Sequence, residues 1–303
     1  MNLPSVRQLE CLVAVEKTRH FGRAAEACFI TQPALSHQIQ QLEGRLGLTL
    51  FERDRRRVVP TRAGEALAAR ARSILGDLRD FSDSAAAFTE PLSGPLRLGV
   101  IPTVAPYVLP RTLGVLRNRH PGLELTLREG QTAELVRELF EGNLDVLFLA
   151  READLGGART LDISRDPFLL AVPTTHPLAS RKRARESDLD GEEVLLLEDG
   201  HCLRDQALTV CDAAGATELG NFRASSLATL LRLVESGLGV TLLPRISVEA
   251  ETGPGRSLCV IPFPKNGPAR ALCLAWRPHA LRSGEYKLLG ETLRAAIDDR
   301  SGH

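Results

Sequence analysis

One long helical pattern between residues 61 and 88 constrains the fold of this 303-residue chain more than any other feature. Thr61 is a suitable N-cap, and the next proline is Pro91, where the helix would have to end. Apolar residues recur along the run at alternating steps of four and three: Leu67, Ala71, Ile74, Leu78, Phe81, Ala85 and Phe88. This heptad spacing favours a two-stranded coiled coil, although the stripe could also pack on the protein's own core. Residues 90–95 would then form a hinge.

The first 60 residues predict a small helical module. Apolar spacing indicates helices over residues 5–17 and 21–28, and Thr31 is an N-cap for a third helix over 32–46, with Pro33 in its first turn. That helix would leave a polar, amide-rich face outside and bury four apolar residues: Leu35, Ile39, Leu42 and Leu46. Two short helices joined by a tight turn, the second with such a face, are typical of a helix-turn-helix that reads DNA. A solvated helix face is the plainer alternative.

Arginines dominate the segment that follows. Residues 50–60 read as a β-hairpin wing, and Arg53 and residues 55–57 on it are suited to neutralising phosphates. Residues 1–72 hold 12 Arg and Lys against 7 Asp and Glu, whereas the whole chain holds 38 of each. A basic N-terminal module on a mildly acidic body is expected of a nucleic-acid reader attached to a second domain.

From residue 96 onward, strand-like and helical runs alternate. Three runs read as buried strands with helices over 107–119 and 132–141 between them, which argues for a parallel α/β sheet: residues 96–100, 123–127 and 146–149. Three further apolar runs suggest a second sheet: residues 168–172, 194–197 and 240–243. A late strand, 271–276, and a last helix, 285–298, could return to the first sheet.

The most informative short motif runs from Glu198 to Ala207 and is closed by Cys211. Cys202 follows an Asp-Gly turn, stands beside His201 and falls in the first turn of a predicted helix. A helix N-terminus and neighbouring cationic groups favour the thiolate, which is the form that reacts with peroxide. In an intact helix the two cysteines would lie about 13 Å apart along the axis. A disulfide needs Cα atoms within about 7 Å, so the pair could bridge only if the segment unwinds, as a redox-driven two-state element.

Signals for other classes of protein are absent from the sequence. No Cys-x-x-Cys or His-x-x-x-His spacing indicates a metal site, and no cofactor is expected. No signal peptide or membrane span is apparent, so we expect the chain in the cytoplasm, where thiols are reduced at rest. The remaining cysteines are expected to pack as small apolar side chains: Cys11, Cys28, Cys259 and Cys273.

The N-terminal module resembles the LysR-type transcriptional regulators. The residues that carry the resemblance are Ala24-Ala25, Thr31-Gln32-Pro33-Ala34-Leu35-Ser36, Gln38-Ile39, Leu42-Glu43, Leu46-Gly47, Leu50-Phe51-Glu52-Arg53, Thr61 and Gly64. The resemblance implies a winged helix-turn-helix whose contacts with double-stranded DNA come from Gln32, Pro33, Ser36, His37 and Arg53.

The same resemblance implies the organisation of the whole chain. The DNA-binding domain would span residues 1–60, and a dimerising linker helix would span residues 61–90. Residues 91–303 would form a two-lobed α/β regulatory domain that resembles the periplasmic binding proteins. One lobe would comprise residues 91–164 and 271–303, and the other 165–270, with ligands bound in the cleft between them. The expected assembly is a tetramer built as a dimer of dimers.

The motif around Cys202 resembles the redox switch of the hydrogen-peroxide sensors within this family. Other segments agree: Ser93-Gly94-Pro95-Leu96, residues 99–104, Pro106-Tyr107, Gln131-Thr132, Phe222-Arg223-Ala224, residues 241–244 and Arg277-Pro278. This similarity implies that Cys202 is the peroxidatic thiol and Cys211 the resolving thiol. It also implies a peroxide pocket shaped by Thr103, Thr132, His201, Asp205 and Arg277. Residues 208–210 differ from those of the best-known members. This difference is expected to affect the rate of the switch and its redox potential, not the reaction of the thiol with peroxide.

Three functions are compatible with these patterns. The leading one is a hydrogen-peroxide-sensing transcriptional activator, not an enzyme, switched by a reversible Cys202–Cys211 disulfide. Its partners would be DNA, hydrogen peroxide, further copies of the chain, RNA polymerase and a dithiol reductant. The second is a LysR-type regulator that responds to a small metabolite between its lobes and has incidental cysteines. The third is a thiol peroxidase with Cys202 as nucleophile, which leaves the helix-turn-helix without a role.

Overall fold

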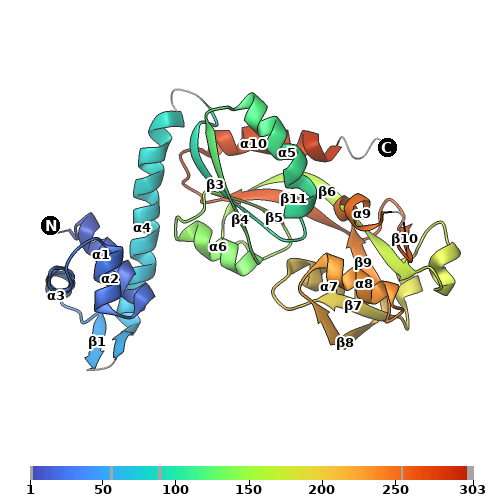
Figure 1. Ribbon diagram of the computed structural model, residues 1–303, viewed down its shortest axis with the longest axis horizontal. Helices are drawn as coiled ribbons and strands as arrows, with labels where there is room; N and C mark the ends of the chain where they lie inside the picture. Colours follow the sequence, from blue (N-terminus) through green and yellow to red (C-terminus); the bar gives the residue numbers. More distant parts are fainter. Residues whose placement is uncertain (1–2, 55–56, 88–90, 254, 299–303) are drawn as a thin grey trace. The chain divides into compact units, whose positions relative to one another are not determined.

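The computed structural model describes residues 3–54, 57–87, 91–253 and 255–298 of the chain (Figure 1). The chain divides into two compact units. One is formed by Met1–Ala85 with Phe140–Asn143, and the other by Ala86–Leu139 with Leu144–His303. Within the described residues, no helix is both long and apolar enough to cross a membrane.

The N-terminal unit consists of helices and one hairpin: α1 (Val6–Thr18), α2 (Phe21–Ala27), α3 (Gln32–Leu46), β1 (Phe51–Asp54), β2 (Arg57–Pro60) and α4 (Arg62–Ala87). Capping residues set the helix starts. Ser5 forms a capping box with Gln8 on α1, and the Thr31 hydroxyl accepts a hydrogen bond from the Ala34 N–H on α3. The predicted helices and the hairpin are confirmed.

The core of this unit lies among α1, α2, α3, the hairpin and the first turns of α4. Leu35, Ile39 and Leu42 are buried as predicted. Phe21 and Phe51 meet edge to face, with their ring centroids 6.3 Å apart. The prediction that Leu46 is buried is wrong: it is 37% exposed, because it falls in the last turn of α3, where the chain turns away at the left-handed Gly47.

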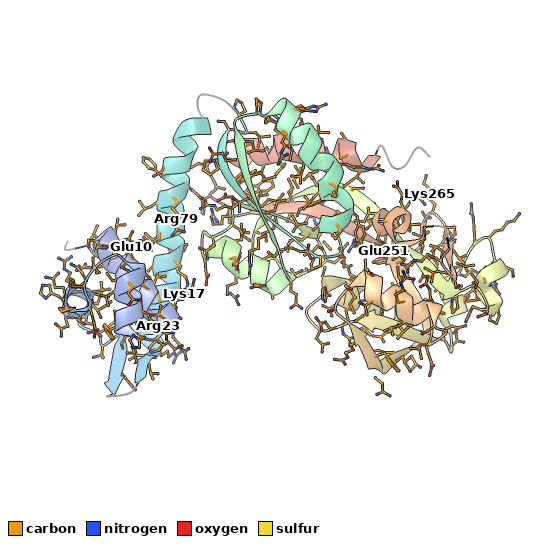
Figure 2. All side chains as sticks on the ribbon, in the orientation of Figure 1. Glu10, Lys17, Arg23, Arg79, Glu251 and Lys265 are labelled. Carbon is orange, nitrogen blue, oxygen red and sulfur yellow. The ribbon has the colours of Figure 1, made fainter. Side chains whose placement is uncertain are left out.

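Glu43 attaches the hairpin to α3. Its Oε1 accepts hydrogen bonds from the backbone N–H groups of Leu50 (2.8 Å) and Phe51 (3.3 Å). The two strands pair antiparallel, with Phe51 opposite Pro60. The side chains of residues 53–57, which include the wing arginines, lie outside the described residues. Figure 2 shows Lys17 and Arg23 among the exposed basic side chains of this unit.

The Thr61 hydroxyl caps α4 by accepting a hydrogen bond from the Gly64 N–H (3.0 Å). Along the heptad stripe, Ala71 is buried in the N-terminal core, whereas three larger residues are 38%, 41% and 70% exposed: Ile74, Leu78 and Phe81. Phe88 and the side chain of Ala85 lie outside the described residues. The stripe therefore packs on the N-terminal core at Leu67 and Ala71 and is solvent-exposed from Ile74 to Phe81, which is the part suited to pairing with a second chain.

A mixed sheet organises the C-terminal unit. The strands β3 (Gly94–Val100), β4 (Leu123–Glu129) and β5 (Val146–Ala150) are parallel, and α5 (Ala105–Arg119) and α6 (Thr132–Phe140) connect them. Two further strands extend it: β11 (Ala269–Trp276) pairs antiparallel with β5, and the long β6 (Arg159–Pro173) pairs antiparallel with β11, so the sheet is not purely parallel as predicted. The prediction that β4 is buried is wrong, because it is the edge strand and most of its residues are exposed or half-buried. The last helix, α10 (Ser283–Asp298), packs against β6 and α5.

The second lobe is built on the continuation of β6. The C-terminal half of this strand pairs with β9 (Thr241–Pro244) and β10 (Leu258–Pro262), so the predicted second sheet is largely an extension of the first. Its other strands, β7 (Glu193–Leu197) and β8 (Thr217–Ala224), form a parallel pair. The helices of this lobe are α7 (Cys202–Ala214), α8 (Leu227–Glu235), α9 (Arg245–Glu251) and the short 3₁₀ segments η1 (Pro177–Ser180) and η2 (Glu186–Leu189). Figure 1 shows the paired β6 and β11 running between the two lobes.

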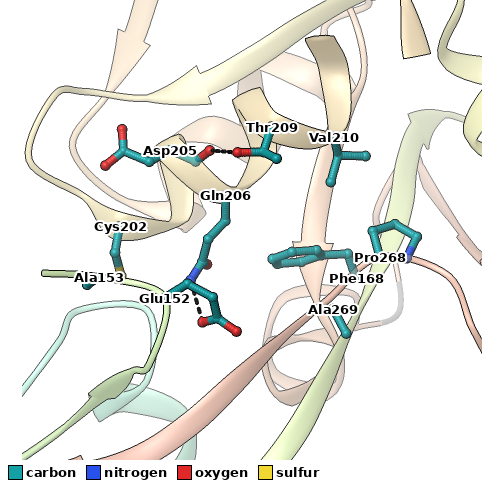
Figure 3. A pocket seen from close by; sticks show the side chains of 10 residues that line it. All are labelled: Glu152, Ala153, Phe168, Cys202, Asp205, Gln206, Thr209, Val210, Pro268 and Ala269. Carbon is teal, nitrogen blue, oxygen red and sulfur yellow. Dashed lines mark hydrogen bonds between the residues drawn. The ribbon is translucent and has the colours of Figure 1, made fainter. Parts of the chain in front are cut away.

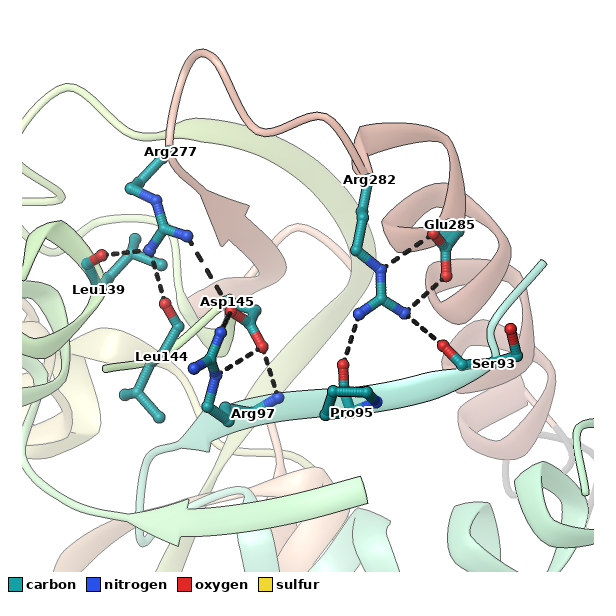
Figure 4. Close-up of polar contacts among 9 residues, drawn as sticks. All are labelled: Ser93, Pro95, Arg97, Leu139, Leu144, Asp145, Arg277, Arg282 and Glu285. Carbon is teal, nitrogen blue, oxygen red and sulfur yellow. Dashed lines mark hydrogen bonds and ion pairs between the residues drawn. The ribbon is translucent and has the colours of Figure 1, made fainter. Parts of the chain in front are cut away.

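The segment before β3 is anchored rather than free. The Leu92 N–H donates a hydrogen bond to Glu285 Oε2 (2.9 Å), and Arg282 donates to the carbonyls of Ser93 (2.9 Å) and Pro95 (Figure 4). Arg282 and Glu285 are a buried ion pair at 2.8 Å. The predicted hinge is therefore wrong for residues 92–95, while residues 88–90 lie outside the described residues.

We expect Gly64→Ala to destabilise the N-terminal unit. A Cβ at Gly64 would lie 2.1 Å from the carbonyl oxygen of Leu50, so backbone would have to shift. Overpacking of this kind costs about 1–3 kcal/mol. Thermal unfolding followed by circular dichroism should show a lower midpoint for this variant. Gly44→Ala is the control, because its Cβ position meets nothing beyond the adjoining turns of its own helix; equal midpoints for the parent and Gly64→Ala would contradict this packing.

Candidate redox site

The helix α7 begins at Cys202 and contains both cysteines of the predicted pair. The chain enters it through Gly200, whose φ of +93° is left-handed, and through His201, the N-cap. The left-handed φ favours glycine here, and a Cβ at Gly200 would lie 2.3 Å from Gln131 Oε1, so the Gln131 side chain would have to move. The predicted turn, followed by a helix with Cys202 in its first turn, is confirmed.

Three segments enclose the Cys202 thiol. Thr103 follows β3, Thr132 begins α6, and His201 precedes α7; the lining is completed by Ile101, Pro102, Gln131 and Gly200. Cys202 is 8% exposed, and the space around it does not admit a water-sized molecule. The structure therefore brings together three of the five predicted pocket residues around the sulfur: Thr103, Thr132 and His201.

Arg270 supplies the positive charge that acts on this thiol. The side chain is fully buried on β11, with Nε 2.9 Å from Asp166 Oδ2 on β6. It donates hydrogen bonds to Thr103 Oγ1 (2.8 Å) and to the Thr103 carbonyl (3.0 Å). Arg270 was not identified from the sequence. The available signal was an arginine beside an apolar strand, because a buried arginine needs a charged or polar partner.

The structure does not bring the predicted Arg277 into this pocket. Arg277 lies just after β11 and donates hydrogen bonds to the carbonyls of Leu139 and Leu144, the latter at 2.7 Å, and it lies 4.0 Å from Asp145 (Figure 4). Buried arginines stand at both ends of β11, Arg270 near its start and Arg277 just after its end. The sequence spacing alone does not tell which end of the strand lies beside Cys202. The assignment of Arg277 to the pocket is therefore replaced by Arg270.

Burial raises the pKa of Cys202, which contradicts the expectation that its surroundings favour the thiolate. Arg270, the Thr132 hydroxyl and the Leu203 N–H lower this pKa, whereas Asp205 raises it further. The Thr132 hydroxyl faces the thiol and lowers its pKa, but the contact falls short of normal hydrogen-bond geometry. Thr132 Oγ1 has no hydrogen-bond partner among the described residues. Burial also lowers the pKa of His201, so this imidazole is neutral at neutral pH.

Cys202 also borders a cleft of about 350 Å³ between the two lobes. Asp205 lines this cleft rather than the closed pocket of the threonines. Gln206 extends from α7 toward Glu152 on the loop after β5, and its Nε2 donates a hydrogen bond to Glu152 Oε2 (3.1 Å; Figure 3). The floor of the cleft is apolar and includes Phe168. The thiol therefore stands between a closed polar pocket and an open cleft.

Cys211 lies in the same helix and is 2% exposed. Burial raises its pKa to about 11, with Asp212 adding to the effect. Both cysteines are free thiols, and the residues between them are helical throughout. At about 1.5 Å per residue, the helix holds them about 13 Å apart along its axis, so the predicted need for unwinding applies to the structure.

The predicted DNA-contacting residues gather at the start of α3. Gln32, Pro33 and His37 are exposed and Ser36 is half-buried. His37 forms a hydrogen bond with Gln41 one turn later (2.8 Å), which orients both polar side chains on the same face. Arg53 lies on β1, and its side chain is outside the described residues.

The other cysteines take no part in this site. Cys11, Cys28 and Cys273 are buried, and Cys259 is half-buried. Burial raises the pKa of Cys11 to about 11 and that of Cys273 to about 12, as expected of thiols packed in a core. In the part of the chain that the structure describes, no group of three or more potential ligands could hold a metal ion.

Comparison with known proteins matches both units of the chain to one family. Residues 6–65 match the bacterial regulatory helix-turn-helix proteins of the lysR family, and residues 89–298 match the LysR substrate binding domain. The chain is 43% identical over 290 residues to the hydrogen peroxide-inducible genes activator of Pectobacterium carotovorum subsp. carotovorum, covering 96% of each protein. It is 42% identical over 294 residues to the DNA-binding transcriptional dual regulator OxyR of Escherichia coli strain K12, covering 97% of this chain and 96% of that protein.

Solved structures are similar over the same length. A full-length OxyR variant from Pseudomonas aeruginosa superposes with a TM-score of 0.78 at 31% identity, covering 97% of this chain and 96% of that one. A hydrogen-peroxide-bound OxyR variant from Corynebacterium glutamicum gives a TM-score of 0.68 at 34% identity, covering 98% and 94%.

We expect Arg270→Met to slow the alkylation of Cys202. Because the arginine charge lowers the pKa of Cys202, its removal should raise that pKa further, and each unit reduces the thiolate fraction about tenfold at a given pH. Iodoacetamide labelling followed by mass spectrometry should show the pH profile of Cys202 moved to higher pH, with Cys259 as the internal standard. Arg270→Lys, which keeps the charge, should shift it less. A profile that does not move in folded Arg270→Met would contradict the assignment of Arg270.

Proposed function

The chain belongs to the LysR family of bacterial transcriptional regulators, and we propose that it is a hydrogen-peroxide-responsive activator switched by a reversible Cys202–Cys211 disulfide. The observation that carries this proposal is the position of Cys202. Cys202 begins α7, lies in a closed pocket with Thr103 and Thr132, and shares its helix with a second thiol; the buried Arg270 donates a hydrogen bond to Thr103 in that pocket. The similarity to OxyR proteins along nearly the whole chain supports the same function.

In the first step we assign Cys202 the role of peroxidatic thiol. The thiolate attacks one oxygen of hydrogen peroxide, the O–O bond breaks, and hydroxide leaves and is protonated to water, which yields a sulfenic acid. Arg270 stabilises the thiolate and the departing hydroxide through its charge. The Thr103 oxygen accepts a hydrogen bond from Arg270, so its own proton is available to a peroxide oxygen. Thr132 has a hydroxyl without a full hydrogen bond to any described residue, and neutral His201 completes the polar lining.

Access to the sulfur is a separate requirement. The closed pocket does not admit a water-sized molecule, whereas the cleft lined by Asp205 and Gln206 also reaches Cys202. We therefore infer that peroxide approaches from the cleft and that the pocket opens as it enters. Asp205 then lines the path of the peroxide, whereas Thr103, Thr132 and Arg270 act on the Cys202 sulfur and the peroxide oxygens.

In the second step the sulfenic acid condenses with Cys211 to form the disulfide and releases water. The helical residues between the two cysteines hold them too far apart for a bond, so α7 must unwind. We propose that this remodelling changes the contacts between the regulatory domains of neighbouring chains. The spacing of their helix-turn-helix domains along the DNA changes as a result. Formation of one disulfide in α7 would thus alter how the whole assembly binds DNA.

DNA contact is assigned to the start of α3 and to the wing, through Gln32, Pro33, Ser36, His37 and Arg53. The exposed stripe of α4 is proposed to pair two chains, because paired half-sites require paired readers, and two dimers would form the tetramer. RNA polymerase and a cytoplasmic dithiol reductant are the further partners that an activator of this kind requires. As a sensor, the protein would react with about one peroxide per subunit and then wait for the reductant, because thiol–disulfide exchange resets it.

The cleft supports a second candidate function. Its volume of about 350 Å³ and its mixed polar and apolar lining suit a small metabolite, which would make the chain a LysR-type regulator with incidental cysteines. That function predicts a DNA footprint that changes with the metabolite and does not respond to peroxide. A thiol peroxidase would instead turn over many peroxides when a reductant is supplied.

We expect about one equivalent of hydrogen peroxide to produce a Cys202–Cys211 bridge in the purified protein. Mass spectrometric thiol mapping should find the bridge within seconds in the parent, no oxidation of Cys211 in Cys202→Ser, and a trapped sulfenic acid on Cys202 in Cys211→Ser. The parent should show a DNA footprint that differs between its reduced and oxidised forms. Unmodified Cys202 at that dose would favour the metabolite-responsive regulator, and sustained peroxide turnover with reductant would overturn the purely sensory role.

A further inference from the structure

Four charged residues beside the redox helix form an ion-pair cluster that the peroxide chemistry does not use. Arg204, in the first turn of α7, makes a bidentate pair with Glu218 of β8, with Nη1–Oε1 at 2.7 Å and Nη2–Oε2 at 2.9 Å. Its Nε lies 2.9 Å from Asp199 Oδ1, in the turn before α7. Arg223 of β8 reaches the same two carboxylates, at 2.6 Å from Asp199 and 3.8 Å from Glu218. We call Asp199, Arg204, Glu218 and Arg223 the α7 clamp.

The centre of the α7 clamp is buried. The Arg204 side chain is 8% exposed and also donates a hydrogen bond to the Leu197 carbonyl at the end of β7 (3.4 Å). A partly buried, bidentate arginine–carboxylate pair within a network is stronger and more directional than an exposed ion pair. The hydrogen bond from Arg204 lowers the pKa of Glu218, so this carboxylate is charged at neutral pH. The clamp therefore ties the first turn of α7 to β7 and β8, which lie beside it in Figure 1.

Arg204 follows Cys202 by only two residues. In the reduced protein, the first turn of α7 keeps Cys202 against the pocket of Thr103 and Thr132. The sulfur can meet that of Cys211 only if this turn leaves its position, because the helix holds the two apart. The contacts of Arg204 with Glu218 and Asp199 must then break or rearrange.

We propose that Arg204 is a positioning residue that holds Cys202 in the peroxide pocket and slows its condensation with Cys211. The proposal rests on the disulfide switch described above. In the condensation, the Cys211 thiolate attacks the sulfenic sulfur of Cys202, the S–S bond forms, the S–O bond breaks, and hydroxide leaves and is protonated to water. In the competing reaction, a second hydrogen peroxide oxidises the sulfenic acid to a sulfinic acid and is itself reduced to water. The strength of the clamp therefore sets how fast the switch closes and what share of Cys202 is overoxidised at high peroxide.

The two steps can be measured separately. In a Cys211→Ser background, Arg204→Gln should form the Cys202 sulfenic acid no faster than the parent, because the α7 clamp holds Cys202 in the pocket where peroxide reacts. With Cys211 present, quenched-flow mass spectrometry should show disulfide closure accelerated about tenfold, which corresponds to about 1.4 kcal/mol. The sulfinic fraction at high peroxide should fall. Glu218→Gln breaks the same pair from β8 and should have the same effects.

Arg232→Gln is the matched control. It removes an arginine–carboxylate pair of the same lobe, with Glu235 at 2.9 Å on α8, that does not involve α7. This variant should match the parent in both steps. Closure, measured from the sulfenic acid onward, that is unchanged or slower in both Arg204→Gln and Glu218→Gln would overturn the proposal.

Amide hydrogen exchange in the reduced protein tests the clamp without peroxide. The amides of α7 should exchange faster in Arg204→Gln than in the parent, whereas those of α8 should exchange equally. If Cys202 is not oxidised in any variant, the proposed function fails while faster exchange of α7 still supports the clamp. Equal exchange of α7 in Arg204→Gln and the parent would overturn the clamp even if the disulfide forms.

Discussion

The redox site depends on the buried ion pair between Arg270 and Asp166. The two residues are directly opposite each other on β11 and β6, the strands that run between the lobes, and both side chains are fully buried. Asp166 also accepts a hydrogen bond from the Ile246 N–H at the start of α9, at 3.1 Å, while Arg270 holds Thr103 beside the thiol. Removing one partner of such a pair costs roughly 3–5 kcal/mol, because the other charge is left buried alone. One interaction thus fixes both the relation of the lobes and the lining of the thiol pocket.

The chemistry of Cys202 is set by a competition between desolvation and charge. Burial raises the pKa of the thiol, whereas Arg270, the Thr132 hydroxyl and the Leu203 N–H lower it. Burial prevails in the reduced protein. A cysteine held in this way reacts through a minor thiolate population, and the surrounding donors then act mainly on the transition state, where charge develops on the leaving oxygen.

The same helix that presents Cys202 also keeps it from Cys211. Hydrogen bonding along α7 and the burial of Cys211 favour the reduced arrangement, and in the proposed switch the new S–S bond offsets the loss of that packing. A two-state element of this kind responds to an oxidant without a separate ligand-binding event. The DNA-binding unit has its own core, formed by residues of α1 to α4 and the hairpin.

Much of this protein could be predicted from its sequence, because the relevant physics is local. Capping residues such as Thr31 and Thr61 and the 3.6-residue apolar period gave the helices of the N-terminal unit, and the turn before Cys202 gave the start of α7. Local patterns do not report what lies across a sheet. The edge position of β4 and the continuation of β6 into the second lobe depend on neighbours that are distant in sequence.

The site divides in the same way. The cysteine pair and its helical spacing were evident from the sequence by itself, because nine residues of helix have a known length. Only the tertiary structure decided that Arg270 rather than Arg277 acts on the thiol, that burial outweighs the charges around Cys202, and that Asp205 faces the cleft. The reason is that electrostatic effects depend on distance and desolvation, and both are set by which strands pair and which side chains they enclose.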